Sequence, residues 1–438
     1  MAEKMKPSGI DWIGDIPNNW ETSRIKYHYQ ISLGKMLQPI QENSTDTLEH
    51  YMCSANITWA GVDTSILKQM WFSPAEKKQY RLLDGDLLVS EGGDVAVSCI
   101  WRNELDECYL QNAVHRVRQN ALSDNRFIYY WLFFLKNYGI VDLICNKATI
   151  AHFTKEKFGE LPICIMSIDE QVAIANFLDK ECAQIDSIAA DLEKQIELLQ
   201  QYKKSLITET VTKGLDKSVP MKDSGVEWIG EIPEHWEISR VRHLASLCSG
   251  ATPSKDVLSY WEGNIPWVSS QEVKSDIIKD TSLHISEEAI NSCSTQLMPA
   301  GTLVMVVRSG ILQHTIPVAL LGVPATINQD IKAFQFNHLM LPAYFKYYIQ
   351  GENDALLSVI IKDKTTVESV DNQLLLSLKI MVPPIEEQKA IVAFLNYKCG
   401  YIDKILNDKQ EQLNLLMQHK KSLIYEYVTG KKRVKEVQ

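Results

Sequence analysis

Two stretches of the sequence gather arginine, asparagine, glutamine, lysine, threonine and serine beside glycine-rich turns. Arginine can donate two hydrogen bonds to guanine, and asparagine or glutamine can make two with adenine. Lysine and threonine more often hold phosphate, while glycine lets backbone amides approach a ligand closely. We take these residues as candidate contacts to double-stranded DNA, although a surface or turn role is at least as frequent for any single one. The first stretch supplies Gly92, Gly93, Arg102, Gln111, Asn112, Arg116, Arg118, Lys147 and Thr149, and the second supplies Ser269, Ser270, Gln271, Arg308, Ser309, Gln313, Asn328, Gln329, Lys364 and Thr366.

Motifs for catalysis are absent from the sequence. An adenine-specific DNA methyltransferase is expected to carry a short Asp/Asn-Pro-Pro-aromatic motif, whereas the one Pro-Pro pair here lies between Val382 and Ile385. Neither a Gly-x-x-x-x-Gly-Lys-Ser/Thr loop for ATP nor a His-Glu-x-x-His zinc motif occurs. The nine cysteines include no Cys-x-x-Cys pair, which argues against a zinc site or disulfide framework and favours small buried apolar residues. We therefore expect no catalytic residue, no metal and no cofactor.

The composition limits where a DNA site can lie. The chain has 438 residues, enough for two to four domains, and carries a net charge of −10. A DNA site must therefore be a local patch, and the acidic remainder suits contacts with a protein partner. No run of about 18 apolar residues occurs, so we expect no membrane span. The N-terminus lacks an apolar signal core, which makes the cytoplasm the expected location.

The chain is a tandem repeat with two conserved parts and two divergent ones. Residues 6–24 and 222–240 share 12 of 19 positions, and residues 170–212 and 387–429 share 23 of 43. The inserts between them, about 25–160 and 241–378, have similar lengths but little common sequence. We call the conserved segments around residues 6–24 and 222–240 the frame. A repeated frame indicates that the chain binds one kind of partner twice, and divergent inserts indicate that it binds two different ligands. The alternative is drift after duplication in a structural protein.

The inserts combine strand and helix patterns and predict α/β domains. Leu87–Ser90, Val95–Ile100 and Thr302–Val307 read as strands, because they are apolar and follow turn residues. Phe127–Leu135 reads as a buried helix, and Leu341–Ile349 matches it in the second insert. The two inserts therefore predict one fold with different surfaces.

The conserved segments 170–212 and 387–429 predict long helices with coiled-coil seams. Residues 170–212 contain neither proline nor glycine, and Gly214 and Gly430 stand where helix ends are expected. The simplest burial pairs the two helices within the chain, and head-to-tail repetition then requires an antiparallel pair with one insert at each end. The alternative is a coiled coil between chains. The predicted seam comprises Ile185, Ile188, Leu192, Leu199 and Leu206 in the first helix, and Ile402, Ile405, Leu416 and Leu423 in the second.

These elements predict a domain order and a fold class. Residues 1–160 form a first recognition domain with a Trp/Pro frame, and 161–215 a helical spacer. Residues 216–378 repeat the domain and its frame, and 379–438 form a second spacer with a basic tail. The fold class is α/β (α+β) globular domains alternating with long α-helices, as a tandem repeat with pseudo-two-fold symmetry and an antiparallel intramolecular coiled coil.

The sequence motifs of the repeat resemble those of one known family along nearly the whole chain. Trp12-Ile-Gly-Asp-Ile-Pro17 with Trp20, Ile265–Gln271, Asn328-Gln-Asp330 and Pro383–Gln388 together resemble specificity subunits of type I restriction–modification systems. The first copy departs from these motifs at Met166–Gln171, where Pro-Pro is missing.

The resemblance implies that each insert is a target recognition domain for one half of a bipartite, asymmetric DNA site. It further implies that the helices set the gap, that two DNA methyltransferase subunits bind the chain, and that ATP-dependent restriction subunits can join. Three alternatives stay open: a coiled-coil scaffold whose inserts bind proteins, an orphan DNA-binding regulator, and a self-sufficient methyltransferase or nuclease.

Overall fold

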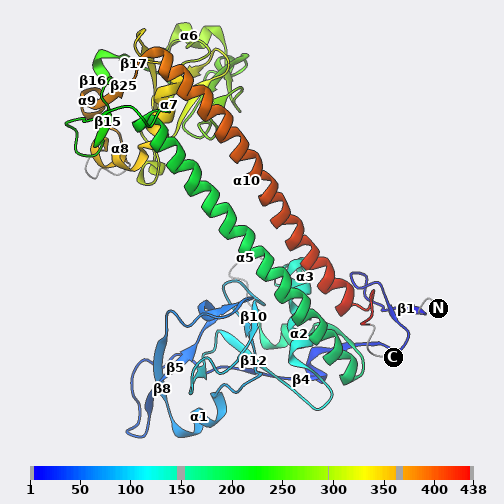
Figure 1. Ribbon diagram of the computed structural model, residues 1–438. Helices are drawn as coiled ribbons and strands as arrows, with labels where there is room; N and C mark the ends of the chain where they lie inside the picture. Colours follow the sequence, from blue (N-terminus) through cyan, green and yellow to red (C-terminus); the bar gives the residue numbers. More distant parts are fainter. Residues whose placement is uncertain (1–3, 146–152, 294, 362–367, 435–438) are drawn as a thin grey trace. The chain divides into compact units, whose positions relative to one another are not determined.

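The computed structural model describes residues 4–145, 153–293, 295–361 and 368–434. Lys147, Thr149, Lys364 and Thr366 lie outside these residues. The chain divides into two compact units, residues 1–193 with 411–438 and residues 194–410. Two long helices, α5 (Ile168–Lys213) and α10 (Ile385–Val428), each contribute one part to each unit (Figure 1).

The first unit is built on an antiparallel four-stranded sheet in the order β10-β9-β12-β4. A three-stranded sheet, β11-β5-β8, lies beside it, and β5 and β11 run parallel. Helix α2 packs against β9, β10 and β12 of the larger sheet (Figure 1). The strands are β4 (Tyr29–Leu33), β5 (Thr47–Met52), β6 (Ile57–Thr58), β7 (Gly61–Val62), β8 (Lys68–Phe72), β9 (Leu87–Ser90), β10 (Ser98–Ile100), β11 (Tyr109–Leu110) and β12 (Val114–Gln119), and the helices are α1 (Pro74–Tyr80), α2 (Asn125–Asn137), α3 (Ile140–Ile144) and α4 (Lys155–Glu160).

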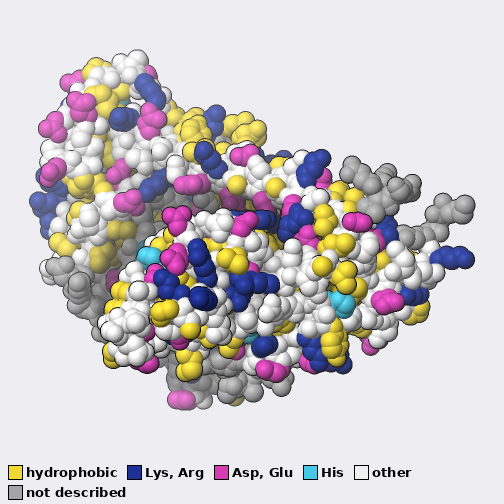
Figure 2. All heavy atoms as spheres, turned by 90° about the horizontal axis from the view of Figure 1, so that it is seen from below, with side chains coloured by type: hydrophobic (Ala, Val, Ile, Leu, Met, Phe, Trp, Pro, Cys, Tyr) yellow, Lys and Arg dark blue, Asp and Glu magenta, His cyan; other side chains and the backbone are white. Residues whose placement is uncertain are grey.

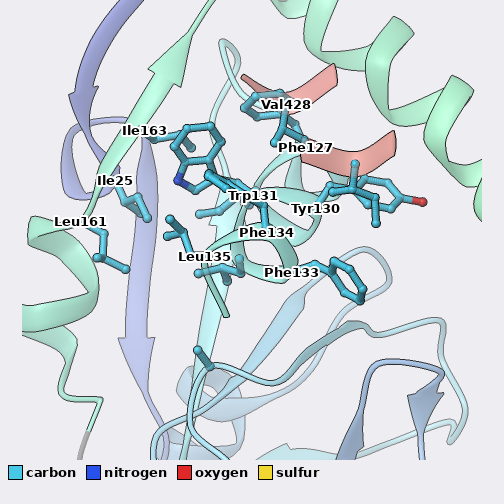
Figure 3. Packing of buried hydrophobic residues seen from close by; sticks show 14 of the residues in the cluster. Ile25, Phe127, Tyr130, Trp131, Phe133, Phe134, Leu135, Leu161, Ile163 and Val428 are labelled. Carbon is cyan, nitrogen blue, oxygen red and sulfur yellow. The ribbon is translucent and has the colours of Figure 1, made fainter. Parts of the chain in front are cut away.

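The core of the first unit centres on α2, where aromatic and aliphatic side chains follow one another. Trp131 is completely buried, and its indole N–H donates a 2.9 Å hydrogen bond to the carbonyl of Pro162. Figure 3 shows Ile25, Leu161 and Ile163 around this end of the core, with Val428 of α10 close to the helix. The end of α10 is therefore part of the same hydrophobic core as the first recognition domain.

The second unit repeats this order of elements. Its sheet, β17-β24-β21-β22-β19, carries one additional strand, and β20-β18-β23 forms the smaller sheet. β18 and β23 pair in parallel, as β5 and β11 do in the first unit. The elements are β17 (Ala245–Ser249), β18 (Ile265–Val268), β19 (Ile277–Ile278), β20 (His284–Ile285), α6 (Glu287–Ser292), β21 (Leu303–Val306), β22 (Val318–Leu321), β23 (Thr326–Ile327), β24 (Ile331–Phe336), α7 (Pro342–Gly351), α8 (Asn353–Ile360) and α9 (Asn372–Ser377).

The predicted elements inside the inserts are found with small shifts. The strand expected at Leu87–Ser90 has those bounds, and Thr302–Val307 shortens to β21. The strand expected over Val95–Ile100 begins only at Ser98, because the preceding Ala96 adopts a positive φ of 65°. The α/β class and the shared fold of the inserts are confirmed.

The Trp/Pro frame ties a recognition domain to the helix ends in each unit. In the first unit it comprises β1 (Met5–Pro7) paired with β2 (Asp15–Pro17), and β3 (Glu21–Arg24) paired with β13 (Pro162–Ile165). In the second it comprises β14 (Met221–Asp223) with β15 (Glu231–Pro233), and β16 (Glu237–Arg240) with β25 (Lys379–Val382). Trp20 and Trp236 are both fully buried in these frames.

Each frame tryptophan meets the end of one long helix. Gly214 and Gly430 follow α5 and α10 with a φ of 72°, as predicted for helix ends. A Cβ on Gly214 would lie 3.2 Å from the Trp236 ring, and one on Gly430 would lie 2.9 Å from the Trp20 ring. Glycine therefore allows the helix end to sit against the indole.

The helix pair is antiparallel in each unit. In the first unit Lys420 pairs with Asp186 at 2.7 Å, and the Phe177 and Tyr427 rings lie 4.4 Å apart. In the second unit Lys203 pairs with Asp403 at 2.6 Å, and Lys409 donates to Gln195 at 2.6 Å. In both pairs the residue number rises along α5 while it falls along α10.

Each heptad of the predicted seam has two apolar positions, and the structure moves one of them by one residue. Ile185 is buried and Leu192 and Leu199 are half-buried, as expected, but Ile188 is 51% exposed. The second position falls four residues after the first, at Ala189, which is 7% exposed, and at half-buried Ile196. The same spacing in α10 places Leu406 and Leu413 on the seam. Steps of three and four residues are both compatible with the sequence, and the position of the partner helix selects four. Of the other predicted seam residues, Leu423 and Ile402 are buried and Leu206, Ile405 and Leu416 are half-buried.

Candidate nucleic-acid interface

One edge of each unit collects most of the described candidate residues. In the first unit β4 and β9 end at this edge and β12 begins there, because both neighbours run antiparallel to β12. β5 and β11 also end there, since parallel strands finish at the same side of a sheet. We call this the first recognition edge and define it by Gly34, Lys35, Ser54, residues 91–93 and residues 111–113.

Backbone hydrogen bonds hold the loops of the first recognition edge together. The Lys35 N–H donates to the Leu110 carbonyl at 2.8 Å, and the Asn112 N–H donates to the Lys35 carbonyl at 2.8 Å. The Glu91 N–H donates to the Ala113 carbonyl at 2.9 Å, which places Gly92 and Gly93 beside Gln111 and Asn112. Four of the predicted residues therefore lie together.

The two amides of this edge are oriented by their neighbours. The Gln111 amide N–H donates to the Asn112 side-chain oxygen at 2.5 Å, and its own oxygen accepts from the Ala113 N–H at 3.0 Å. Both side chains are half-buried. Each Gln111 amide atom uses one of its two hydrogen-bonding positions in these contacts, so the oriented, half-exposed amide keeps one donor and one acceptor for an adenine edge.

The second recognition edge has the same construction. It consists of Gly250, Thr252, residues 269–271, residues 308–309 and residues 328–330. The Asn328 N–H donates to the Val268 carbonyl at 2.9 Å, and the Val307 N–H donates to the Asp330 carbonyl at 2.8 Å. These bonds bring Ser269, Ser270 and Gln271, which follow β18, to the same edge as Arg308 and Ser309, which follow β21.

Polar side chains at the second edge differ in how far they are engaged. Gln329 is exposed and accepts a 2.6 Å hydrogen bond from the Thr252 hydroxyl, and Arg308 is exposed. Gln313 is exposed and donates to Glu368 at 2.8 Å. Asn328 is only 5% exposed and bonds to Asp330 through both its amide oxygen and its amide nitrogen, so its side chain shapes the turn.

Three predicted arginines lie away from the first recognition edge. Arg116 is 7% exposed and donates to the carbonyls of Gln79 and Arg81, and burial lowers the pKa of its guanidinium. Arg118 binds the Asp86 carboxylate with two hydrogen bonds of 2.6 and 2.9 Å. Arg102 is exposed and follows β10, at the opposite end of the sheet. Arg116 and Arg118 therefore support the fold, and a base contact is not proposed for them.

Figure 2 shows Lys and Arg side chains gathered in one patch, with carboxylates interspersed around it. Within the described part of the first recognition edge, however, Lys35 is buried and ion-paired with Glu76. The first edge thus offers amides rather than free cations, whereas the second offers Arg308.

Sequence reasoning missed the glycines that pin each edge. A Cβ on Gly34 would lie 2.4 Å from the Gln111 carbonyl, and one on Gly250 would lie 1.6 Å from the Ile327 carbonyl oxygen. Both positions therefore exclude any larger residue. The two glycines lie one repeat apart, a signal that a comparison of the inserts could have found.

Four of the cysteines are deeply buried. Burial raises the pKa of Cys99, Cys108, Cys164 and Cys182 to about 12, which keeps their thiols protonated and unreactive. Across the described ranges, no cluster of three His, Cys, Asp or Glu side chains is placed to hold a metal ion. In the same ranges, no helix is both long and apolar enough to cross a bilayer.

The fold and these edges define a class of protein in which one scaffold, used twice, presents two different polar loop surfaces. A family described as type I restriction modification DNA specificity domain matches residues 17–198 and again 233–415. This chain belongs to that family.

Relatives agree with this family, and solved structures agree with the fold. The type I restriction enzyme EcoR124I/EcoR124II specificity subunit of Escherichia coli is 31% identical over 279 residues, which span 62% of this chain and 62% of that protein. The MjaVIII specificity subunit of Methanocaldococcus jannaschii is 24% identical over 96% of this chain and 95% of its own. A chain from a structure on complex assembly and conformational transition of a type I R-M system has a TM-score of 0.72 at 14% identity and covers 95% of this chain and 99% of its own. The HsdS subunit from Thermoanaerobacter tengcongensis has a TM-score of 0.50 at 13% identity, over 95% of this chain and 98% of its own.

Proposed function

We propose that this chain is the DNA sequence-specificity subunit of a type I restriction–modification complex and carries out no catalysis itself. The observation that carries the proposal is the pairing of a conserved frame with two unlike recognition edges. Each recognition domain would read one half of a bipartite, asymmetric site in double-stranded DNA. Methylation and ATP-dependent cleavage would belong to partner subunits.

The difference between the edges supports two different half-sites. The first presents the adjacent amides of Gln111 and Asn112. The second presents Arg308, Gln329 and the serines that follow β18. Arginine favours guanine and amides favour adenine, so one construction can discriminate different base sequences.

The long helices supply the second part of the proposal, a spacer that also docks the methyltransferase subunits. In the second unit Leu198 and Tyr202 of α5 and Tyr397 and Tyr401 of α10 are exposed. Leu198, Tyr202 and Tyr401 each directly precede a seam position, at Leu199, Lys203 and Ile402, so in an antiparallel pair these three side chains lie on one face. Tyr397 lies one helical turn before Tyr401. Lys203 opposite Asp403 places them at neighbouring levels. Exposed aromatic side chains in such a row are typical of a protein contact.

The experiment that tests this proposed function is co-expression of the full chain with a methyltransferase subunit, followed by methylation mapping of cellular DNA. We expect one asymmetric motif with two specified halves and an unspecified gap. The purified chain should methylate and cleave nothing alone, and activity of the chain alone would instead support the self-sufficient enzyme.

Two further measurements separate the remaining alternatives. A coiled-coil scaffold predicts no salt-dependent affinity for DNA, whereas a specificity subunit loses affinity steeply as salt rises. An orphan regulator would bind DNA but would not co-purify with a methyltransferase subunit. Replacing both Tyr397 and Tyr401 by serine should weaken that co-purification while the same changes at exposed Leu83 and Leu122 should not.

A further inference from the structure

The loop that follows β4 exposes apolar side chains at the first recognition edge. Met36 is 75% exposed and Leu37 is 55% exposed, directly after the buried Lys35. Lys35 is fixed by its backbone bonds to Leu110 and Asn112, and the Gln38 carbonyl accepts a 3.0 Å bond from the Trp71 N–H of β8. Met36 and Leu37 therefore lead from the Gln111–Asn112 amides toward β8. Large exposed apolar residues next to oriented polar groups indicate a contact surface.

The equivalent loop of the second unit has a different chemistry. It begins at Gly250, which packs against β23 as Gly34 packs against β11. The positions equivalent to Met36 and Leu37 are Thr252, which is exposed, and Pro253, which is buried, whereas the exposed apolar residues Val257 and Leu258 come only later in this loop. Since the backbone construction is shared, packing within the fold does not require Met36 and Leu37. Their chemistry is therefore free to follow the ligand of the first domain.

We propose that Met36 and Leu37 are specificity-determining residues of the first recognition domain and contact thymine methyl groups in the major groove. This inference rests on the proposed function and deepens it. Thymine alone among the four bases presents a methyl group there, and apolar side chains recognise it. The neighbouring Gln111 and Asn112 amides suit the adenine of the same or an adjacent base pair. The first half-site therefore contains at least one A·T pair under this loop.

The test removes the methyl group without changing base pairing. The first half-site is identified by methylation mapping and by exchange of residues 25–160. In synthetic duplexes each thymine of that half-site is then replaced singly by deoxyuridine, and binding of the full chain with its methyltransferase subunits is measured. For the wild type we expect a loss of affinity of about fourfold at one or more positions, the effect of one buried methyl group.

Variants assign the effect to the loop. Met36→Ala and Leu37→Ala should bind the thymine duplex more weakly by a similar factor and lose the response to deoxyuridine. Leu122→Ala changes an exposed leucine at the opposite end of the sheet and should keep the wild-type response. In the second half-site deoxyuridine should affect wild type and variants equally.

Several results would overturn the inference. A first half-site made only of G·C pairs, a wild type indifferent to every deoxyuridine, or variants that keep the full response would each reject it. So would a loss of methyltransferase co-purification in Met36→Ala, because the loop would then be a protein contact. Failure to find any bipartite site would reject the proposed function itself, whereas the other outcomes leave that function intact.

Discussion

The Glu387 carboxylate accepts a 3.0 Å hydrogen bond from the indole N–H of Trp236. Glu387 lies in the first turn of α10, Trp236 belongs to the frame, and Gly214 at the end of α5 lies against both side chains. His235 also contacts this carboxylate, at 2.8 Å. One acidic residue thus joins the start of one helix, the end of the other and the second frame.

Replacing this carboxylate tests how strongly the frame is held. Glu387→Leu leaves the buried indole N–H without an acceptor, and we expect a loss of about 1–3 kcal/mol in the stability of the second unit. This loss of unfolding free energy is measured by urea unfolding, with hydrogen exchange of the α10 amides as the readout. Glu386→Leu is the matched control, because exposed Glu386 pairs with Lys389 on the surface and its loss should change stability by less than about 0.5 kcal/mol. Equal effects of the two changes would contradict the role of Glu387.

Gly250→Ala should disrupt the second recognition edge. The new Cβ would meet the Ile327 carbonyl oxygen at 1.6 Å, so the loop must shift away from β23. We expect weaker discrimination in the second half-site and a loss of about 1–3 kcal/mol. Gly400→Ala is the control: it lies in α10 with open space around it and should stabilise the helix by about 0.5–1 kcal/mol. Unfolding midpoints and binding to the mapped site check both.

Acidification should destabilise the first unit through His115. Its ring nitrogen Nε2 lies 2.6 Å from the Phe153 carbonyl, and burial lowers the pKa of this histidine below 6.5. A lowered pKa in the folded state means that the neutral form is stabilised. This contribution is present above pH 6.5 and decreases as the pH falls further, because the unfolded chain takes up the proton first.

The measurement is the slope of unfolding free energy against pH between 7.5 and 5.5. For the first unit the wild type should be steeper than His115→Gln, by up to about 1.4 kcal/mol for each pH unit. His338→Gln changes an exposed histidine of the second unit and should leave that slope as it is. If His115→Gln cannot be purified, NMR titration of His115 in the wild type gives its pKa directly, and a value at or above 6.5 would reject the explanation.

Shortening both helices by one heptad should shorten the gap in the DNA site. Deleting Leu192–Leu198 together with Lys409–Leu415 keeps the seam in phase and removes about 10 Å of helix, equivalent to about three base pairs. Methylation mapping would report the new gap. Deleting five residues, Leu192–Ile196, turns the seam by roughly 140° and should abolish pairing of the helices. An unchanged gap after the paired heptad deletion would refute the spacer.

Exchange of residues 25–160 for another family member's domain should alter one half-site only. The pair β3 and β13 lies just outside these bounds and keeps the frame intact. Gln171, which Gln388 matches in the second repeat, anchors the exchanged domain, since its amide donates to the Leu122 and Met166 carbonyls at 3.1 Å. Changes in both halves of the methylated motif would argue against modular reading.

The amino-acid sequence alone determined the repeat, the class of fold and the extent of the long helices. Segments 170–212 and 387–429 hold a regular apolar spacing free of proline, and they correspond to α5 and α10 within two residues. Gly214 and Gly430 end the helices as predicted, because a left-handed backbone there suits glycine. These properties depend on local spacing and conformation, which the sequence carries directly.

Only the tertiary structure decided which polar residues are available to a ligand and which face of each helix is the seam. Arg118 meets Asp86 and Arg116 meets Gln79 because strand register brings together residues more than thirty positions apart. Ile188 and Ala189 both fit a heptad, and the partner helix determines that Ala189 is buried. Long-range packing chooses among arrangements that local pattern leaves equal, and the recognition edges depend on that choice.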